Sequence, residues 1–223
     1  MYMTSFSKTC IVLTTTVNVH PNSSFQVDKV ERINTYVTAI RKWLAFTGFN
    51  IVVVENSGHA FDELKSESNV FKDRFEIVTF NQVEESNFKE DQMHLRCKGG
   101  LEIESIHYAY NNSSFVKKST FVVKITGRFF VPYFNEYINS IDVDNCDGLK
   151  QFFNFRCEIV GCHIKNFHNI FNRNLFCENG IYDYHVENVY EYRFSLYKNI
   201  ITCPKFRIEP TQRGGLNEVY HSL

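Results

Sequence analysis

Two continuous apolar runs, each followed at once by polar residues, constrain the fold of this 223-residue chain most. Cys10–Val17 and Asn50–Glu55 are rich in Val, Ile and Thr, and neither run alternates apolar with polar side chains. Strands of this kind are buried on both faces, as in the middle of a parallel sheet that helices cover. The sequence therefore predicts an α/β fold.

The segment between these runs predicts a helix, because its apolar side chains recur every three or four residues: Val30, Ile33, Val37, Ile40 and Leu44. Asp28 and Glu31 form an expected N-cap pair, and Gly48 is expected just past the helix end. Phe75–Phe80 is a third expected strand. This alternation of strands and helices predicts parallel strands joined by right-handed crossovers, with ligands at the carboxyl ends of the strands.

The stretch Lys98–Val131 predicts a helix, a polar turn and an apolar strand that breaks at Thr126-Gly127-Arg128. In an extended segment Lys124, Thr126 and Arg128 share parity and point to one side of the sheet. Two cations and a hydroxyl facing one place would suit a pyrophosphate. The alternative is a Lys and an Arg that reach solvent at the end of the sheet.

The rest of the chain predicts shorter elements within the same single domain. A helix is expected after Pro132, a strand over Phe155–Ile164, and a last short strand over Lys205–Ile208. Residues 181–200 predict a long helix on which Asp183 and Glu187 lie one turn apart.

The composition excludes several classes of function. Twenty-four basic and 25 acidic residues leave a formal net charge of -1, so we expect no nucleic-acid partner and no attraction to an anionic membrane. No apolar run reaches the roughly 20 residues that span a bilayer, and residues 1–10 do not resemble a signal peptide. The seven cysteines are scattered and odd in number, which favours reduced thiols in the cytoplasm.

Five motifs in order along the chain resemble small glycosyltransferases of the GT-A type, the nucleotide-diphospho-sugar transferases of bacterial surface-polysaccharide loci and large DNA viruses: TTTVNV, WLAFTG, IVVVENSG, KGGLEIESIHYAY and VVKITGRFFV. The resemblance implies one GT-A-like, Rossmann-like domain with a mostly parallel central sheet flanked by helices. It implies a donor half over residues 10–131, an acceptor half over 132–208 and a flexible tail over 209–223. For a viral protein the cytoplasm would be that of the host.

The same resemblance implies roles for residues at the strand ends. Thr14, Thr15 and Thr16 would meet the nucleoside, and Glu55 and Asn56 the base or ribose. Lys98 and Gly99 would lie near ribose or phosphate at a helix start, where the helix dipole favours anions. Lys124, Thr126, Gly127 and Arg128 would hold the diphosphate. Ordinary turn and cap chemistry is the alternative for each of these residues.

The chain departs from the family pattern where many GT-A enzymes carry an Asp-x-Asp metal motif, because Thr126-Gly127-Arg128 stands there. Two explanations remain open. Arg128 and Lys124 would neutralise the diphosphate without a metal, which we favour. Alternatively Asp142 and Asp144, or Asp147, would return to the site from the following loop with Mg²⁺ or Mn²⁺.

Sugar transfer with inversion needs a group that takes the proton of the acceptor hydroxyl. Glu187 is the chosen catalytic base, with Asp183 close behind it; a solvated helix face is the alternative. The predicted function is transfer of a hexosyl or deoxyhexosyl group from a nucleoside-diphosphate donor, UDP-linked, to a saccharide acceptor. A sugar-nucleotide nucleotidyltransferase and a non-catalytic glycan- or nucleotide-binding module are the competing interpretations.

Overall fold

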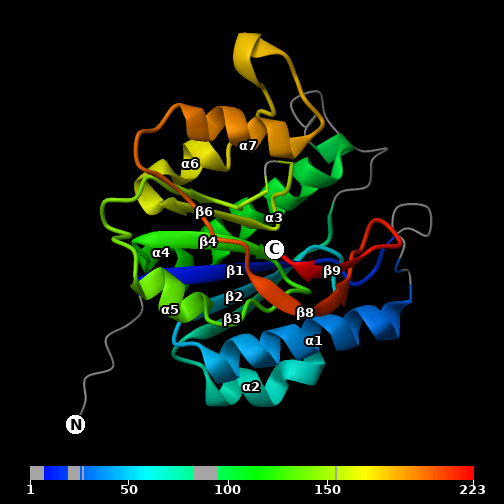
Figure 1. Cartoon of the computed structure of the whole chain (residues 1–223). Coiled ribbons are helices and arrows are strands. Elements are labelled where there is room, and N and C mark those ends of the chain that lie inside the picture. Colours follow the sequence, from blue (N-terminus) through cyan, green and yellow to red (C-terminus); the bar gives the residue numbers. More distant parts are fainter. Residues whose placement is uncertain (1–7, 20–25, 27, 83–94, 154) are drawn as a thin grey trace.

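A computed structural model describes residues 8–19, 26, 28–82, 95–153 and 155–223 of the chain. A seven-stranded sheet forms its centre, in the order β3-β2-β1-β4-β6-β5-β7 (Figure 1). Its strands are β1 (Thr9–Thr15), β2 (Asn50–Glu55), β3 (Phe75–Thr79), β4 (Phe121–Thr126), β5 (Gly148–Lys150), β6 (Ile159–His163) and β7 (Ile200–Thr202). The first four strands are parallel, β6 is antiparallel to both of its neighbours, and β7 is parallel to β5. The expected α/β domain with a mostly parallel sheet is confirmed.

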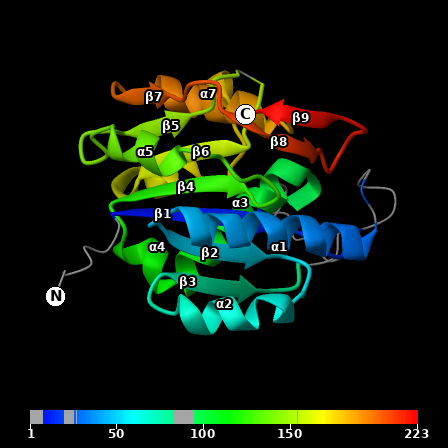
Figure 2. The same ribbon diagram turned by 60° about the horizontal axis from the view of Figure 1, so that its bottom comes forward.

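Helices cover both faces of this sheet (Figures 1 and 2). One face carries α1 (Lys29–Phe46) and α5 (Phe134–Asn139), and α2 (Lys65–Val70) follows the short 3₁₀ helix η1 (Asp62–Leu64) beside β3. The other face carries α3 (Lys98–Asn112), α4 (Ser114–Lys118), α6 (Phe167–Ile170) and α7 (Val186–Ser195). Two further 3₁₀ helices are η4 (Ile164–Asn166) and η5 (Glu178–Gly180).

The side chains of β1 alternate between these two layers. Ile11 and Leu13 pack toward α1, whereas Cys10 and Val12 pack toward α3. Every residue of β1 and β2 is buried. Because both faces of these strands are covered, the sequence shows continuous apolar runs where a half-exposed strand would alternate.

Helix α1 begins as the sequence predicts, since the Asp28 side chain accepts a hydrogen bond of 2.8 Å from the backbone amide of Glu31. Val37, Ile40 and Leu44 of the expected face are buried, whereas Val30 in the first turn is 64% exposed. Trp43 also lies in the core and donates to the Phe129 carbonyl at 2.9 Å. Gly48 lies just past the helix end, as predicted. The helix ends at an extended Thr47, and the Gly48 amide donates to the Asn135 side chain at 3.2 Å.

Residues 209–223, expected to form a flexible tail, instead belong mostly to an antiparallel hairpin of β8 (Arg207–Gln212) and β9 (Val219–Ser222). The hairpin packs on the α1 face of the sheet and buries Ile208, Tyr220 and Leu223. The Tyr220 ring stacks on Phe129 with 5.9 Å between ring centroids.

The later half of the chain differs most from the prediction. The long helix expected over residues 181–200 is the shorter α7, and β7 begins at Ile200. The expected strand over Phe155–Ile164 begins only at Ile159, and β5 and α6 were not predicted. Within the described ranges, no helix combines the length and the apolar character needed to cross a bilayer.

Candidate functional site at the carboxyl ends of the parallel strands

The carboxyl ends of β1, β2 and β4 meet at one edge of the sheet. Thr14 is in register with Thr126, and Thr15 with Glu55. The ladder continues past β4, because the Gly127 amide donates to the Thr14 carbonyl at 2.9 Å. A Cβ atom on Gly127 would lie only 2.6 Å from Cγ2 of Thr15 and 2.8 Å from that carbonyl oxygen. Glycine is therefore required for this close approach.

A carboxylate from α3 lies between the two threonines at this edge. Thr14 Oγ1 donates to Oε1 of Glu102 at 2.8 Å, and Thr126 Oγ1 lies 3.5 Å from the same oxygen. The other oxygen, Oε2, lies 2.6 Å from Nζ of Lys124. Sequence reasoning missed Glu102. A signal was present, because a lysine inside the apolar run of a central strand needs a buried counter-ion.

Lys124 is fully buried, and its ammonium also donates to the Cys157 carbonyl. Burial disfavours its charged form, but the Glu102 carboxylate outweighs burial, so that the pKa of Lys124 is raised. The Lys124 ammonium is thus bound within the protein, on the α3 side of the sheet.

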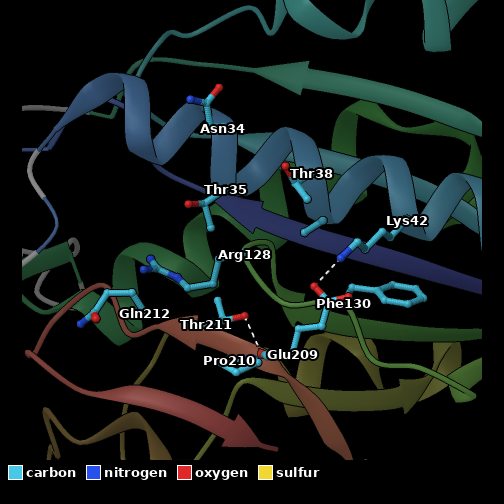
Figure 3. A pocket seen from close by; sticks show the side chains of 11 residues that line it. Asn34, Thr35, Thr38, Lys42, Arg128, Phe130, Glu209, Pro210, Thr211 and Gln212 are labelled. Carbon is cyan, nitrogen blue, oxygen red and sulfur yellow. Dashed lines mark hydrogen bonds and ion pairs between the residues drawn. The ribbon is translucent and has the colours of Figure 1, made fainter.

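Arg128 lies on the opposite side, against α1 (Figure 3). Its guanidinium carbon is 5.8 Å from the centre of the Tyr36 ring, and Nη2 is 3.4 Å from the Tyr36 hydroxyl. The prediction that Lys124 and Arg128 face one place is therefore wrong. Strand alternation ends with β4 at Thr126, and the turn that follows carries Arg128 to the other layer.

A second arginine accompanies Arg128 at the end of β1. Arg32 is buried; its Nη2 donates to the Tyr36 hydroxyl at 2.9 Å and its Nε to the Thr16 carbonyl at 2.8 Å. Within the described part of the chain, Nη1 of Arg128 is buried and has no hydrogen-bond partner. A buried donor without an acceptor is costly, so an acceptor from a ligand would be favourable there.

The tip of the β8–β9 hairpin lies over two of the predicted donor residues. A Cβ atom on Gly214 would come within 2.3 Å of both terminal nitrogens of Arg128. A Cβ atom on Gly215 would lie 3.7 Å from Nζ of Lys98. The hairpin tip thus brings the first residue of α3 and the turn after β4 to one region of the edge.

Gly99, next to Lys98, has a packing role. Its added Cβ would lie 2.4 Å from Cβ of Val186 at the start of α7, so the helices α3 and α7 approach closely there. The Cys97 side chain accepts from the Gly100 amide at 3.3 Å and caps α3.

Glu55 is turned into the protein. Its carboxylate is buried and accepts from the backbone amides of Val17 and Ser57 at 2.9 Å and of His59 at 2.8 Å. It therefore organises the loops after β1 and β2, and its oxygens are occupied without a ligand. Thr15 is likewise engaged, since Oγ1 donates to the Val54 carbonyl at 3.1 Å.

Asn56, the next residue, has an available acceptor. Its amide nitrogen donates to Ser105 Oγ at 3.1 Å, whereas Oδ1 is buried without a hydrogen-bond partner in the part of the chain that the structure describes. A buried carbonyl oxygen without a donor is costly, so a ligand N–H or O–H would be favourable there.

The two candidate bases do not share a helix. Asp183 precedes α7 and accepts from the His185 amide at 2.7 Å and the Asn188 side chain at 2.9 Å. The Asn188 and His185 hydrogen bonds lower its pKa, which makes it a weaker base. Glu187 lies in the first turn of α7, half-buried, and Oε1 is 3.7 Å from the Cys157 sulfur. The predicted pairing of these two carboxylates on one face is therefore wrong.

Asp142 and Asp144 lie at the opposite edge of the sheet. Asp144 pairs at 2.5 Å with Lys8, which directly precedes β1, and Asp142 accepts from the Asn145 side chain at 2.6 Å. The loop leads into Gly148, which pairs with Cys162 and so lies near the amino end of β4. These aspartates do not reach the carboxyl edge, and the proposal that they bring a metal to it is wrong.

No cluster of three His, Cys, Asp or Glu side chains in the described ranges is arranged to hold a metal ion. At the strand ends, the Glu102 carboxylate is already paired with Lys124. The described residues at the strand ends therefore do not form a site for the Mg²⁺ or Mn²⁺ ion that the resemblance allowed.

Solved structures share this architecture. A nucleotide-diphospho-sugar transferase from Desulfovibrio desulfuricans is 14% identical, with 89% of this chain and 80% of that chain covered and a TM-score of 0.50. The apo glycosyltransferase GlyE of Streptococcus pneumoniae is 5% identical (90% and 46% covered, TM-score 0.53). The bifunctional WbbM is 10% identical (89% and 39% covered, TM-score 0.52).

This chain spans less than half of GlyE and of WbbM. No family model matches the sequence, and no curated protein matches it either. The likeness therefore concerns the course of the backbone. The chain has the GT-A-type fold of the nucleotide-diphospho-sugar transferases.

Proposed function

We propose that the protein transfers a hexosyl or deoxyhexosyl group from a nucleoside-diphosphate donor, UDP-linked, to a saccharide acceptor in polysaccharide biosynthesis. The observation that carries this proposal is Arg128 at the carboxyl ends of four parallel strands, a cation whose buried Nη1 has no hydrogen-bond partner among the described residues. Ligands of open α/β sheets bind outside this edge. The seven free thiols fit a cytoplasmic location.

Arg128 and Lys98 are the proposed diphosphate ligands. Both neighbour the hairpin tip, through Gly214 and Gly215, and Lys98 is the first residue of α3, where the helix dipole also favours anions. The two cations would neutralise the charge that develops on the leaving diphosphate.

The nucleoside is proposed to lie across the ends of β1 and β2. Asn56 Oδ1 is the acceptor for a base or ribose donor, because it is buried and no residue in the described ranges donates to it. Thr14 and Thr16 contribute the adjoining wall. Glu55 acts indirectly, by holding the loop amides of Val17 and Ser57 in place.

Glu187 is the proposed base, acting on the acceptor hydroxyl. As that oxygen forms its bond to the anomeric carbon, its proton passes to the Glu187 carboxylate and the bond from that carbon to the diphosphate oxygen breaks. The electron pair of the broken bond leaves with the diphosphate, next to Arg128 and Lys98. Asp183 fixes the start of α7 and thereby the position of Glu187.

A thermal-shift panel of UDP, GDP, dTDP and CDP tests the donor site, since a ligand of the native state raises the melting temperature. We expect UDP to stabilise the protein in the presence of EDTA and Arg128→Ala to abolish the shift. Arg41→Ala, which removes an exposed arginine on the outer side of α1, is the matched control and should keep the shift. Stabilisation by none of the four nucleotides would refute the proposal.

Release of UDP from UDP-sugars separates a transferase from a binding module of the same fold. A protein that binds UDP but releases it from no UDP-hexose or UDP-deoxyhexose, with a panel of saccharide acceptors present, would be a binding module. UDP release that depends on an acceptor, and that Glu187→Gln reduces by at least about 100-fold, would support the transferase.

A further inference from the structure

A groove of about 340 Å³ runs along α1 on the side facing β8 (Figure 3). Its walls come from α1, from the chain just after β4 and from β8. Arg128 lies within it, and the Lys42–Glu209 ion pair joins its two walls. Its size is within the range of about 300 to 1,000 Å³ that small-molecule sites have.

The walls of this α1–β8 groove carry polar groups that the protein itself does not use. The exposed side chains of Asn34 and Thr38 have no hydrogen-bond partner among the described residues. Gln212 donates its amide nitrogen to the carbonyls of Arg213 at 3.3 Å and Leu216 at 2.9 Å, which leaves its side-chain oxygen as an acceptor. Both donors and acceptors therefore line the groove.

Phe130 adds a rigid apolar surface. Its ring is half-buried and meets Trp43 edge-on, with 5.2 Å between centroids, and it also touches Phe46 at 6.0 Å. Ala39 and Pro210 are the other apolar residues of the lining. An aromatic ring beside amide and hydroxyl groups suits a sugar, whose C–H face is apolar and whose hydroxyls both donate and accept.

The charge of the groove narrows the choice of ligand. Glu209 neutralises Lys42, which leaves Arg128 as the unbalanced charge among the lining residues. Nucleic acids and polyphosphates are held by several cations at once, and the lining does not supply them. The apolar lining is also too small for an amphipathic helix, which needs a hydrophobic groove.

We propose that the α1–β8 groove binds a saccharide chain, with Asn34, Thr38 and Gln212 bonded to its hydroxyls and Phe130 beneath a sugar ring. Its role as the acceptor site rests on the function proposed above: Arg128 belongs both to the groove and to the proposed diphosphate site, so a chain in the groove would end near the donor.

Binding of fluorescent hexasaccharides to the full chain, without nucleotide, tests the groove. The panel contains hexasaccharides of glucose, N-acetylglucosamine, galactose, fucose and galacturonic acid. Thr38→Trp fills the groove from an exposed position of α1, and Ser66→Trp places the same side chain on an exposed position of α2 as the matched control. We expect at least one saccharide to bind, with affinity at least 10-fold lower in Thr38→Trp and unchanged in Ser66→Trp.

The proposal that the α1–β8 groove binds a saccharide would be overturned if none of the hexasaccharides bound, or if Thr38→Trp left their binding intact. The UDP thermal shift of the same variants keeps this result apart from the donor hypothesis. Saccharide binding that Thr38→Trp weakens in a protein that binds no nucleotide would support the groove and refute the proposed function. A normal UDP shift without saccharide binding would support the donor site and refute the saccharide groove.

Discussion

Nζ of Lys124 lies 2.6 Å from Oε2 of Glu102, and this ion pair ties the centre of the sheet to α3. The two partners differ in exposure: the Lys124 side chain is fully buried, whereas that of Glu102 is 20% exposed. Because Glu102 also accepts from Thr14, the pair fixes the helix over the carboxyl ends of β1 and β4. Removing one partner leaves the other charge behind, and the consequence depends on which charge water can reach.

Glu102→Gln is expected to destabilise the protein more than Lys124→Met. The first change leaves an ammonium in the interior, which costs about 3 to 5 kcal/mol; the second leaves a carboxylate that is partly hydrated and costs less. Urea unfolding of the two single variants measures the difference. The double variant should lose less than the sum of the two losses, because the charges interact. Equal losses in the two single variants would contradict the exposure argument.

Glu55→Gln is expected to lower stability by about 1.5 to 3 kcal/mol, the worth of a hydrogen bond to a charged group. Gln has a single side-chain oxygen, so its NH₂ group would face at least one of the backbone amides that now donate to Glu55, and two donors cannot bond to each other. Glu63→Gln, on the exposed side of η1, is the control and should change stability by less than about 0.5 kcal/mol. A Glu55→Gln protein of normal stability that had lost UDP binding would instead favour direct contact with the nucleoside.

The fold could be predicted from the sequence because its central strands and first helix each have a recognisable local sequence pattern. Buried parallel strands give continuous apolar runs, and the Asp28 cap marks the start of α1. The short elements have no comparable sequence pattern. Strand β5, which follows the loop of Asp142, has only three residues, and without it the end of the sheet at which Asp142 lies could not be predicted.

The candidate site could be predicted only as a set of strand ends. The direction in which a side chain points depends on where its strand ends. Strand β4 ends at Thr126, and Arg128 in the following turn lies on the opposite side of the sheet from Lys124. Glu102 is four residues from Lys98 on α3, and only the packing of α3 on the sheet makes it the partner of Lys124. Such pairings are tertiary, so periodicity does not reveal them.

Asp183 and Glu187 are expected to differ in what their loss affects. Asp183→Ala removes the hydrogen bonds just before and within the first turn of α7, and we expect a loss of about 0.5 to 1.5 kcal/mol in stability, the net contribution of a typical hydrogen bond. Glu187→Gln should leave urea unfolding and UDP binding unchanged while acceptor-dependent turnover falls. If Glu187→Gln retained turnover and Asp183→Asn, which keeps the shape of the side chain, lost it, the base would be Asp183 instead.

Because of His107, the free energy of unfolding is expected to decrease as the pH falls from about 6.5 to about 4. Burial, together with the nearby Arg173, lowers the pKa of His107 from 6.5 to about 4, although its ring nitrogen contacts the Phe171 carbonyl at 2.6 Å. Below pH 6.5 the unfolded chain takes up a proton that the folded protein still refuses, so the free energy of unfolding rises with pH across this window.

The measurement compares urea unfolding of the wild type and of His107→Gln at pH 7.5, 6.5, 5.5 and 4.5. Gln keeps a donor for the Phe171 carbonyl but does not titrate. All other residues are the same in the two proteins, so the difference in stability reports on position 107. The stability difference between the two proteins should be constant above pH 7 and should shift against the wild type as the pH falls toward 4.5. Parallel profiles over the whole range would mean that the folded protein accepts the proton on His107 as readily as the unfolded chain does.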